Sequence, residues 1–203
     1  MSVSYIIGID EVGRGPIAGP LCVGACLMSV AKAGRFGKTL AGIKESKQLT
    51  PHKREEWLRI ICDAQEAGEC RFSTVFVSEK VIDTKGLSFA LRSAIDKALQ
   101  KLRADPKASL VLLDGGIKAP PRFTRQKTII KGDEKEPLIA SASIVAKVRR
   151  DRYMTRLGKR YPDYGFEVHK GYGTKKHYEA LKAHGILEVH RMSFLKKLIT
   201  HNA

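Results

Sequence analysis

Apolar residues recur along the chain with two periods, one typical of β-strands and one typical of α-helices. Five short apolar or alternating runs predict strands, at residues 5–9, 21–28, 71–77, 109–113 and 126–131. The last two are predicted to be buried, and glycine and aspartate follow each of them. Lysine, arginine and glycine are frequent in residues 29–46, which therefore predict an exposed loop.

Helical spacing is clearest over residues 87–102, where apolar positions repeat at intervals of three and four. Thr50 and Pro51 are typical of a helix start, because the hydroxyl can cap the helix and proline suits its first position. Gly68 predicts the end of that helix. Both segments are expected to bury one apolar face.

The C-terminal half of the chain predicts three more helices. Pro137 opens a long one whose later turns carry basic residues, among them Lys147. Thr174 supplies a cap for a shorter helix, and residues 194–199 predict a last one.

These elements together predict an α/β protein. We expect a mixed sheet of about five strands flanked by helices, with a small helical extension at the C-terminus. A chain of 203 residues is long enough for one domain with a modest appendage. We place a boundary near residue 150, so that residues 1–150 form the core. Residues 151–203 then form a helical subdomain packed on that core as one structural unit.

The chain is strongly basic, with 37 lysines and arginines against 21 acidic residues and a formal net charge of +16. The excess is uneven, because residues 1–100 carry a net charge of +3 and residues 101–203 carry +13. Such a charge distribution favours a phosphate backbone as the partner. The ribosome or an anionic membrane also fits the charge alone.

The sequence predicts neither a membrane span nor a signal peptide. Its most apolar stretch, residues 17–33, is interrupted by Pro20 and follows acidic residues rather than a basic segment. The four cysteines have no zinc-type spacing, and we interpret them as reduced thiols. We therefore expect a cytoplasmic protein, and a monomer.

Acidic residues follow three of the predicted strands. Asp10 comes after the first, Asp114 after the fourth and Asp133 after the fifth, and Glu11 stands beside Asp10. The functional crevice of an open α/β sheet lies beyond the carboxyl ends of its strands, where these side chains can converge. Clustered carboxylates repel one another unless a cation compensates, and oxygen ligands favour Mg²⁺ or Mn²⁺. The alternative is that each is a solvated turn residue, and Glu11 joins the cluster only if its strand ends or bends there.

Two further segments carry groups suited to phosphate or sugar. Gly13-Arg14-Gly15 lets backbone amides approach a ligand closely, while the guanidinium grips a phosphate or stacks on a sugar. Ser46-Lys47 precedes a predicted helix and offers a hydroxyl and an ammonium group to a phosphate. Each segment also fits a plainer interpretation, as a turn between strands or as a solvated loop.

Aromatic and basic residues are concentrated between residues 161 and 176. Tyr172 and its aromatic neighbours can stack on bases or sugars, and Lys170 can contact a nucleic-acid backbone. The alternative is a tightly turned loop whose rings fill a small core. The histidines show no metal-binding spacing, and we interpret them as surface or helper residues.

Several motifs occur in order along the chain: GIDEVGRGP at residues 8–16, KGD at 131–133, ASASIVAKV and RD between 140 and 151, HKGYGT at 169–174, and HRMSF at 190–194. Together they resemble type 2 ribonuclease H, the bacterial ribonuclease HII family, from about residue 6 to residue 194. The resemblance implies a ribonuclease H-like fold. It also implies that Asp10, Glu11, Asp114 and Asp133 are the catalytic carboxylates, which hold two Mn²⁺ or Mg²⁺ ions.

The resemblance also implies a substrate and its contacts. The family hydrolyses the RNA strand of RNA/DNA hybrids and nicks duplex DNA on the 5′ side of embedded ribonucleotides, leaving 3′-hydroxyl and 5′-phosphate ends. The residues that match its substrate contacts are Gly13, Arg14 and Gly15 at the 2′-hydroxyl, Tyr172 against the following sugar, and Ser46, Lys47, Lys147 and Lys170.

One position departs from the family, because Glu45 stands where aspartate usually precedes Ser-Lys. The longer side chain keeps the charge and changes its reach. Two other classes compete with this interpretation. A non-catalytic nucleic-acid-binding protein would have lost part of the carboxylate set, and ribonuclease HIII usually carries an N-terminal domain, for which a first motif at residue 8 leaves no room.

Overall fold

The computed structural model describes residues 2–195. Its strands are β1 (Tyr5–Val12), β2 (Leu21–Ser29), β3 (Cys70–Val77), β4 (Ser109–Asp114) and β5 (Gln126–Ile129). Its helices are α1 (Ala33–Thr39), α2 (Pro51–Glu66), α3 (Glu79–Lys85), α4 (Leu87–Lys101), α5 (Gly132–Lys135), α6 (Pro137–Arg160), α7 (Phe166–His169) and α8 (Lys175–His184). Short 3₁₀ turns lie at Val30–Lys32, Ser46–Gln48, Pro162–Tyr164 and Met192–Phe194.

The five strands form one mixed sheet in the order β3-β2-β1-β4-β5. β2 pairs antiparallel with both β1 and β3, whereas β1, β4 and β5 run parallel to one another. The pairing of β1 with β4 ends where Ile9 lies opposite Leu113, but β1 continues along β2 until Val12 lies opposite Cys22. The last residues of β1 therefore extend beyond the carboxyl end of β4.

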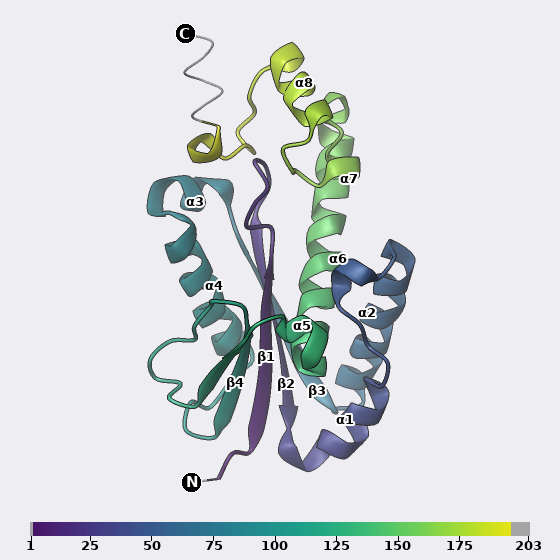
Figure 1. Ribbon diagram of the computed structural model, residues 1–203, viewed down its shortest axis with the longest axis vertical. Helices are drawn as coiled ribbons and strands as arrows, with labels where there is room; N and C mark the ends of the chain where they lie inside the picture. The colour runs from purple at the N-terminus through teal and green to yellow at the C-terminus, as the bar shows by residue number, and fades with distance from the viewer. Residues whose placement is uncertain (1, 196–203) are drawn as a thin grey trace.

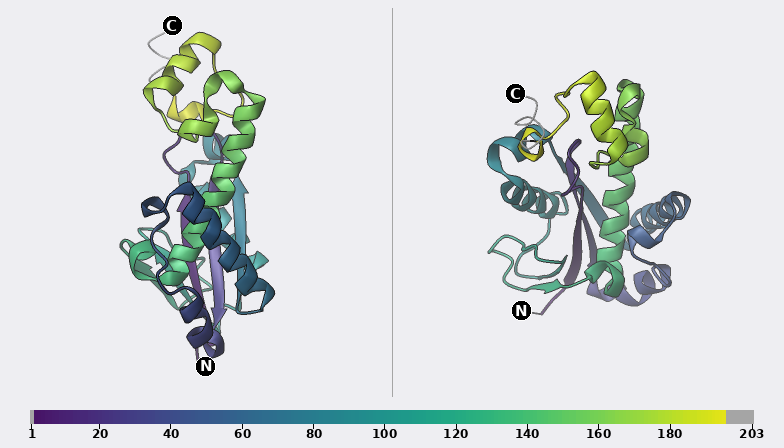
Figure 2. Two further views of the ribbon diagram at one scale, coloured as in Figure 1. Left: turned by 90° about the vertical axis from the view of Figure 1, so that its right-hand side faces the viewer. Right: turned by 45° about the horizontal axis from the view of Figure 1, so that its top comes forward.

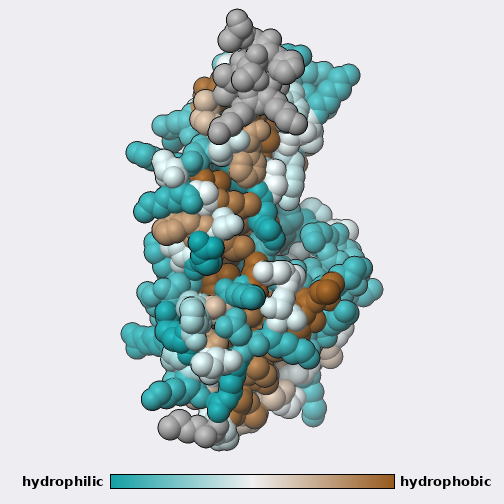
Figure 3. All heavy atoms as spheres, turned by 60° about the vertical axis from the view of Figure 1, so that its left-hand side comes forward, coloured by the Kyte–Doolittle hydropathy of each residue, from teal (hydrophilic) through white to brown (hydrophobic). Residues whose placement is uncertain are grey.

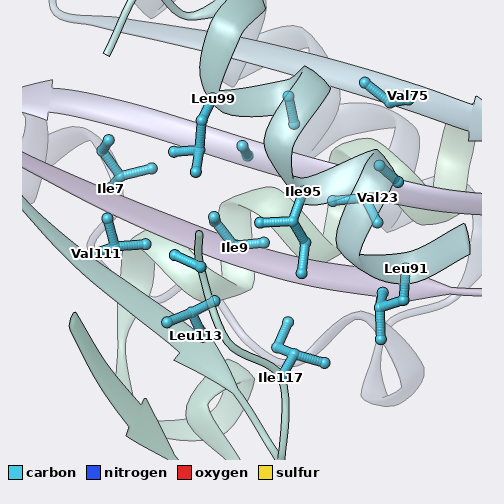
Figure 4. Packing of buried hydrophobic residues seen from close by; sticks show 14 of the residues in the cluster. Ile7, Ile9, Val23, Val75, Leu91, Ile95, Leu99, Val111, Leu113 and Ile117 are labelled. Atoms are coloured by element: carbon cyan, nitrogen blue, oxygen red, sulfur yellow. The ribbon is translucent and has the colours of Figure 1, made fainter. Parts of the chain in front are cut away.

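Helices cover both faces of this sheet (Figure 1). α3 and α4 lie on one face, and α6 lies with α1 and α2 on the other, as the turned views in Figure 2 also show. Ile7, Ile9 and Val23 point to the first face and pack against Leu91 and Ile95 of α4 (Figure 4). The other face forms a second apolar cluster with α1, α2 and α6. The α/β architecture expected from the sequence is confirmed.

α6 packs directly on the sheet because two strand residues are glycines. A Cβ atom at Gly8 would overlap the backbone of Leu138, and one at Gly24 would overlap the carbonyl oxygen of Ala142. The first turns of α6 are almost fully buried as a result. This close packing places Ser143 beside the end of β1, where the acidic residues lie.

Most predicted helices are confirmed, and so are their start signals. Thr50 caps α2 by accepting a hydrogen bond from the N–H of Lys53, and Thr174 caps α8 by accepting one from the N–H of His177. Pro137 is the first residue of α6, which runs without a break through residue 150. Most of the helix predicted over residues 194–199 lies outside the described residues.

Three predictions about local structure are wrong. Residues 29–46 contain α1 instead of only an exposed loop, because Phe36 and Leu40 are buried in the α6-side core. β5 is not buried, because it is the edge strand of the sheet. α3 was not predicted, since a helix of two turns shows little periodicity.

The elements after α6 form a small apolar cluster around the C-terminal half of that helix. Tyr164 and Phe166 stack within it, with 5.5 Å between ring centroids, and Met154 of α6 is fully buried against them. These rings therefore fill a core, as the plainer interpretation of this segment holds. Among the helices within residues 2–195, none combines the length and apolar character that a membrane span requires.

Two buried histidines in this cluster form a hydrogen-bonded chain that accommodates at most one protonated ring. Nδ1 of His177 lies 2.9 Å from the carbonyl oxygen of Tyr172 and donates to it, and Nε2 of His177 lies 3.1 Å from Nε2 of His190. Nδ1 of His190 either accepts from the N–H of Leu187 at 3.0 Å or donates to the carbonyl oxygen of Leu187 at 3.2 Å. Protonation of both rings would place two Nε2–H groups against each other.

We therefore expect stability to fall in mild acid. Burial lowers the pKa of His177 from 6.5 to about 4, and burial also lowers the pKa of His190. The unfolded chain binds these protons first, so the free energy of unfolding decreases as pH falls from about 6.5 towards 4. The slope is at most about 1.4 kcal/mol per pH unit for each histidine.

Urea unfolding between pH 7.5 and 5 measures this effect. The His177→Gln variant should show a shallower dependence on pH than the wild type, because one titrating ring is gone. His52→Gln is the matched control, because it removes an exposed histidine outside this cluster. Equal slopes in His177→Gln and the wild type would contradict the assignment.

Candidate active site

The predicted site residues meet in one cavity at the end of β1. This cavity, which we call the acidic cavity, has a volume of about 250 Å³. β1 and the turn after it supply one wall, and β4, α6 and the segment before α2 supply the others. The lining residues are Asp10, Glu11, Val12, Gly13, Arg14, Gly15, Ser46, Lys47, Asp114, Ser143, Lys147 and Tyr172.

Asp10 and Glu11 enter the cavity from a strand that does not end at them. The sequence predicted that the strand stops before Asp10, but β1 continues to Val12 on the edge of β2. Beyond Ile9 the β4 side of β1 is open, so both acidic side chains reach the same cavity despite their strand alternation. Asp10 is 5% exposed and accepts a hydrogen bond from the N–H of Glu11 at 2.7 Å.

Burial makes these carboxylates costly to ionise. It raises the pKa of Asp10 to about 8, and the nearby charges of Glu11 and Asp114 add to the rise. Burial also raises the pKa of Glu11, although Arg14 opposes that rise through a bond of 3.1 Å to Oε1. Ionisation of the cluster therefore creates negative charge that the protein only partly compensates.

The donor atoms of this cluster fit a hard divalent cation. Oε2 of Glu11 is buried and has no hydrogen-bond partner among the described residues. Within residues 2–195 no three acidic, histidine or cysteine side chains are already gathered as a complete metal site. Repulsion explains this arrangement, because Glu11 turns one oxygen to Arg14 and Asp114 accepts from the N–H of Gly132 at 2.7 Å. Oxygen donors of this kind suit Mg²⁺ or Mn²⁺.

Asp133 lies near this cluster but does not line the acidic cavity. The sequence predicted that Asp133 lies at the end of a strand. Instead, β5 ends at Ile129, and Asp133 lies in α5. Lys131, just before α5, adopts a left-handed backbone conformation with φ 55°. Asp133 is 6% exposed, and burial followed by the charge of Asp114 raises its pKa. The N–H of the preceding residue, Gly132, donates to Asp114 at 2.7 Å, which places Asp133 beside the cluster.

The Gly13–Gly15 turn is held in place by two fully buried arginines. Arg191 donates to the carbonyl oxygens of Gly13 at 2.7 Å and Arg14 at 2.9 Å. Arg150 donates to the carbonyl oxygens of Pro20 at 2.9 Å and Lys170 at 3.0 Å. Gly13 has φ 92°, and a Cβ there would overlap the Arg150 side chain, so glycine is required.

Tyr172 faces this turn from the C-terminal cluster. Its side chain is 44% exposed, unlike the buried rings of Tyr164 and Phe166. A Cβ at Gly15 would lie 4.0 Å from Cε1 of Tyr172, so the tyrosine ring and the turn border the same opening. Two segments that are far apart in sequence thus frame the entrance to the acidic cavity.

Ser46 and Lys47 line the cavity from the segment before α2. The Ser46 hydroxyl is buried and lies 2.9 Å from the Ser143 hydroxyl, and both serines line the same cavity as Asp10. Lys47 is exposed and lies 3.3 Å from Glu45. Burial opposes its charge, but the bond to Glu45 and the charges of Asp133 and Asp10 outweigh burial and raise its pKa.

Lys147 and Lys170 lie along a larger groove of about 800 Å³ between α2, α6 and α7. Lys147 borders both this groove and the acidic cavity, and its Nζ atom lies 2.8 Å from Asp151. Lys170 borders only the groove, and its Nζ atom donates to Thr155 at 2.8 Å. The structure therefore places Lys170 outside the acidic cavity, in the groove that it shares with Lys147.

Sequence reasoning assigned no role to Ser143, Arg150 or Arg191. Ser143 looks like a small core residue of a helix, and only its position in the lining of the acidic cavity reveals its place in the site. The arginines look like surface charges in a basic chain, but both are fully buried. In the sequence, their role was indicated by their positions inside the motifs RD and HRMSF.

Comparisons with known proteins agree with this geometry. A family model for ribonuclease HII matches residues 7–197. Ribonuclease HII of Caldicellulosiruptor bescii is 42% identical over 196 residues, covering 97% of this chain and 89% of that protein. The crystal structure of ribonuclease H2 from Pyrococcus horikoshii OT3 has a TM-score of 0.75 and 26% identity, covering 97% of this chain and 98% of that chain. Bst-RNase HIII in complex with Mn²⁺ shares the fold, with a TM-score of 0.72 and 20% identity over 98% of this chain and 70% of that chain.

A mixed sheet that carries buried carboxylates at the end of its central strand, in a fold shared with these enzymes, defines a nuclease of the ribonuclease H class. Within that class, the chain belongs to the ribonuclease HII family. It is a hydrolase of a divalent-metal-dependent family that acts on RNA/DNA substrates.

Proposed function

We propose that the protein is an endoribonuclease that hydrolyses the RNA strand of RNA/DNA hybrids and nicks duplex DNA on the 5′ side of single embedded ribonucleotides. The products would carry 3′-hydroxyl and 5′-phosphate ends. The observation that carries the proposal is the acidic cavity itself, in which buried carboxylates and the Gly13–Gly15 turn border the same space.

Asp10, Glu11, Asp114 and Asp133 are the residues that would hold two Mg²⁺ or Mn²⁺ ions. When bound, such ions supply an activated water and stabilise the leaving 3′-oxygen. The N–H of Glu11 holds Asp10 by a hydrogen bond, and the buried surroundings strengthen the attraction between carboxylate and cation. Lys47 lies close enough to Asp10 and Asp133 to attract a phosphate towards the cluster.

Selection of the ribonucleotide depends on a single 2′-hydroxyl. The turn at Gly15 has no side chain beyond its Cα, so backbone groups can approach the sugar closely. Tyr172, on the other side of the opening, would pack against the following sugar. Lys147 and Lys170 would contact the backbone along the groove beside α6.

We further propose that the protein acts as a monomer in the cytoplasm, with residues 151–203 working as a subdomain of the catalytic core. The four cysteines are free, and three of them are buried, which suits a reducing compartment. Contacts of Arg150 and Arg191 with the turn after β1 tie the C-terminal elements to the core.

A labelled DNA duplex with one internal ribonucleotide tests the proposed function. We expect metal-dependent nicking on the 5′ side of the ribonucleotide, with Mg²⁺ or Mn²⁺ and not with chelator. An all-DNA duplex of the same sequence is the control and should stay intact. Tight binding of both duplexes without nicking would instead support a non-catalytic nucleic-acid-binding protein.

A further inference from the structure

A second cavity lies next to the acidic cavity, on the other side of Arg14. It has a volume of about 280 Å³ and lies between the first turns of α4 and the segment after β4. Arg14, Arg92, Lys118 and the Ser88 hydroxyl line it, above apolar side chains that include Leu91 and Ile95. We call it the basic pocket.

The charges in the basic pocket are of one sign. Its lining contains three cations and no acidic residue. Arg92 and Lys118 are exposed, and neither makes a hydrogen bond or an ion pair with another described residue. Figure 3, which turns the α4 side of the molecule forward, shows hydrophilic side chains interspersed with apolar surface.

The larger groove beside α6 is different, because several of its cations are already paired. Lys147 lies 2.8 Å from Asp151, and Arg152 forms an ion pair with Glu55. A phosphate that enters that groove must compete with carboxylates for these side chains. In the basic pocket only Arg14 has such a partner, Glu11, so an anion meets less competition at Arg92 and Lys118.

Local geometry adds to this preference for an anion. Ser88 lies in the first turn of α4, a helix of 15 residues that has no side-chain cap at its N-terminus. The unpaired N–H groups of that turn and the helix dipole both favour negative charge. The apolar side chains of Leu91 and Ile95, which also line the pocket, offer no hydrogen-bond acceptors that compete with an anion.

We propose that the basic pocket binds a backbone phosphate of the nucleic-acid duplex, next to the phosphate that is cleaved. This inference rests on the proposed function, since the acidic cavity must hold the scissile group. Arg14 borders both cavities and therefore places the two phosphates beside each other. The pocket contacts the charged phosphate and neither a base nor a sugar, so it strengthens binding of any duplex to a similar degree.

A double variant, Arg92→Gln with Lys118→Gln, tests the proposal by binding alone. Fluorescence anisotropy with a labelled all-DNA duplex and a matched duplex containing one ribonucleotide, both in chelator, measures Kd without cleavage. We expect Kd to rise by about tenfold for both duplexes. The slope of log Kd against log salt concentration should fall by about 1, because the contact with one phosphate is lost.

The matched control is Lys97→Gln with Lys107→Gln, which removes the same charge from exposed positions outside the pocket. If both double variants change Kd and the salt slope equally, the effect is one of net charge and the proposal is overturned. An unchanged salt slope in the pocket variant overturns it as well. Because no cleavage is measured, failure of the proposed nuclease reaction would be seen separately, in the nicking assay of the wild type.

Discussion

Replacing Asp10 with asparagine is expected to reduce turnover roughly a thousandfold, which corresponds to about 4 kcal/mol of transition-state stabilisation. Asp10 is the most deeply buried of the cavity carboxylates, and burial, Glu11 and Asp114 raise its pKa to about 8. Its negative charge exists at neutral pH only when a cation compensates it. Asparagine keeps the shape of the side chain but cannot supply that charge to a cation.

The folded structure should survive this change. Asparagine retains the oxygen that accepts the N–H of Glu11, and it replaces a carboxyl group whose ionisation costs free energy without a cation. We expect Tm in chelator to be no lower than that of the wild type, and duplex binding to persist. Single-turnover cleavage with Mg²⁺ and with Mn²⁺ measures the loss. Asp63→Asn, on the exposed face of α2, is the matched control and should cleave normally.

An Asp10→Asn enzyme that retained more than a tenth of wild-type turnover would contradict the role of this carboxylate. A loss of folded protein in chelator would instead contradict the argument that its buried charge is uncompensated. Thermal unfolding and cleavage therefore test separate parts of the prediction.

Gly15→Ala is expected to reduce cleavage at a single embedded ribonucleotide by roughly a hundredfold. The backbone of Gly15 has an ordinary φ angle, and the nearest atom to an added Cβ is Cε1 of Tyr172 at 4.0 Å. The fold therefore accepts the methyl group. The bound sugar would not, because the methyl group occupies the space that lets the backbone reach the 2′-hydroxyl.

Substitutions at two other glycines are the controls for this experiment. Gly37→Ala, on α1, adds a methyl group with nothing within 4 Å and should leave both cleavage and stability intact. Gly13→Ala should lower Tm, because φ is 92° there and the methyl group overlaps Arg150. If the Gly15→Ala variant cleaves single ribonucleotides as fast as the wild type, the turn does not approach the sugar.

Local sequence signals predicted the elements whose packing follows from their own pattern. The apolar repeat of α4, the caps at Thr50 and Thr174, and the start of α6 at Pro137 all depend on neighbouring residues. α1 escaped prediction because its stability depends on burial of Phe36 in a core made by distant elements. The exposure of β5 depends on strand order, which no single segment encodes.

The chemical groups of the site could be read from the sequence: three carboxylates in recognisable motifs, a fourth after a predicted strand, a glycine-flanked arginine and an excess of positive charge in the second half. How these groups act together depends on the fold. The fold brings Glu11 into the acidic cavity by extending β1 past β4, and it buries Arg150 and Arg191. It also leaves Arg92 and Lys118 beside Arg14 without a hydrogen-bonding or ionic partner among the described residues. Ionisation and pairing depend on burial and on distances between remote segments, and those are properties of the fold rather than of the order of residues.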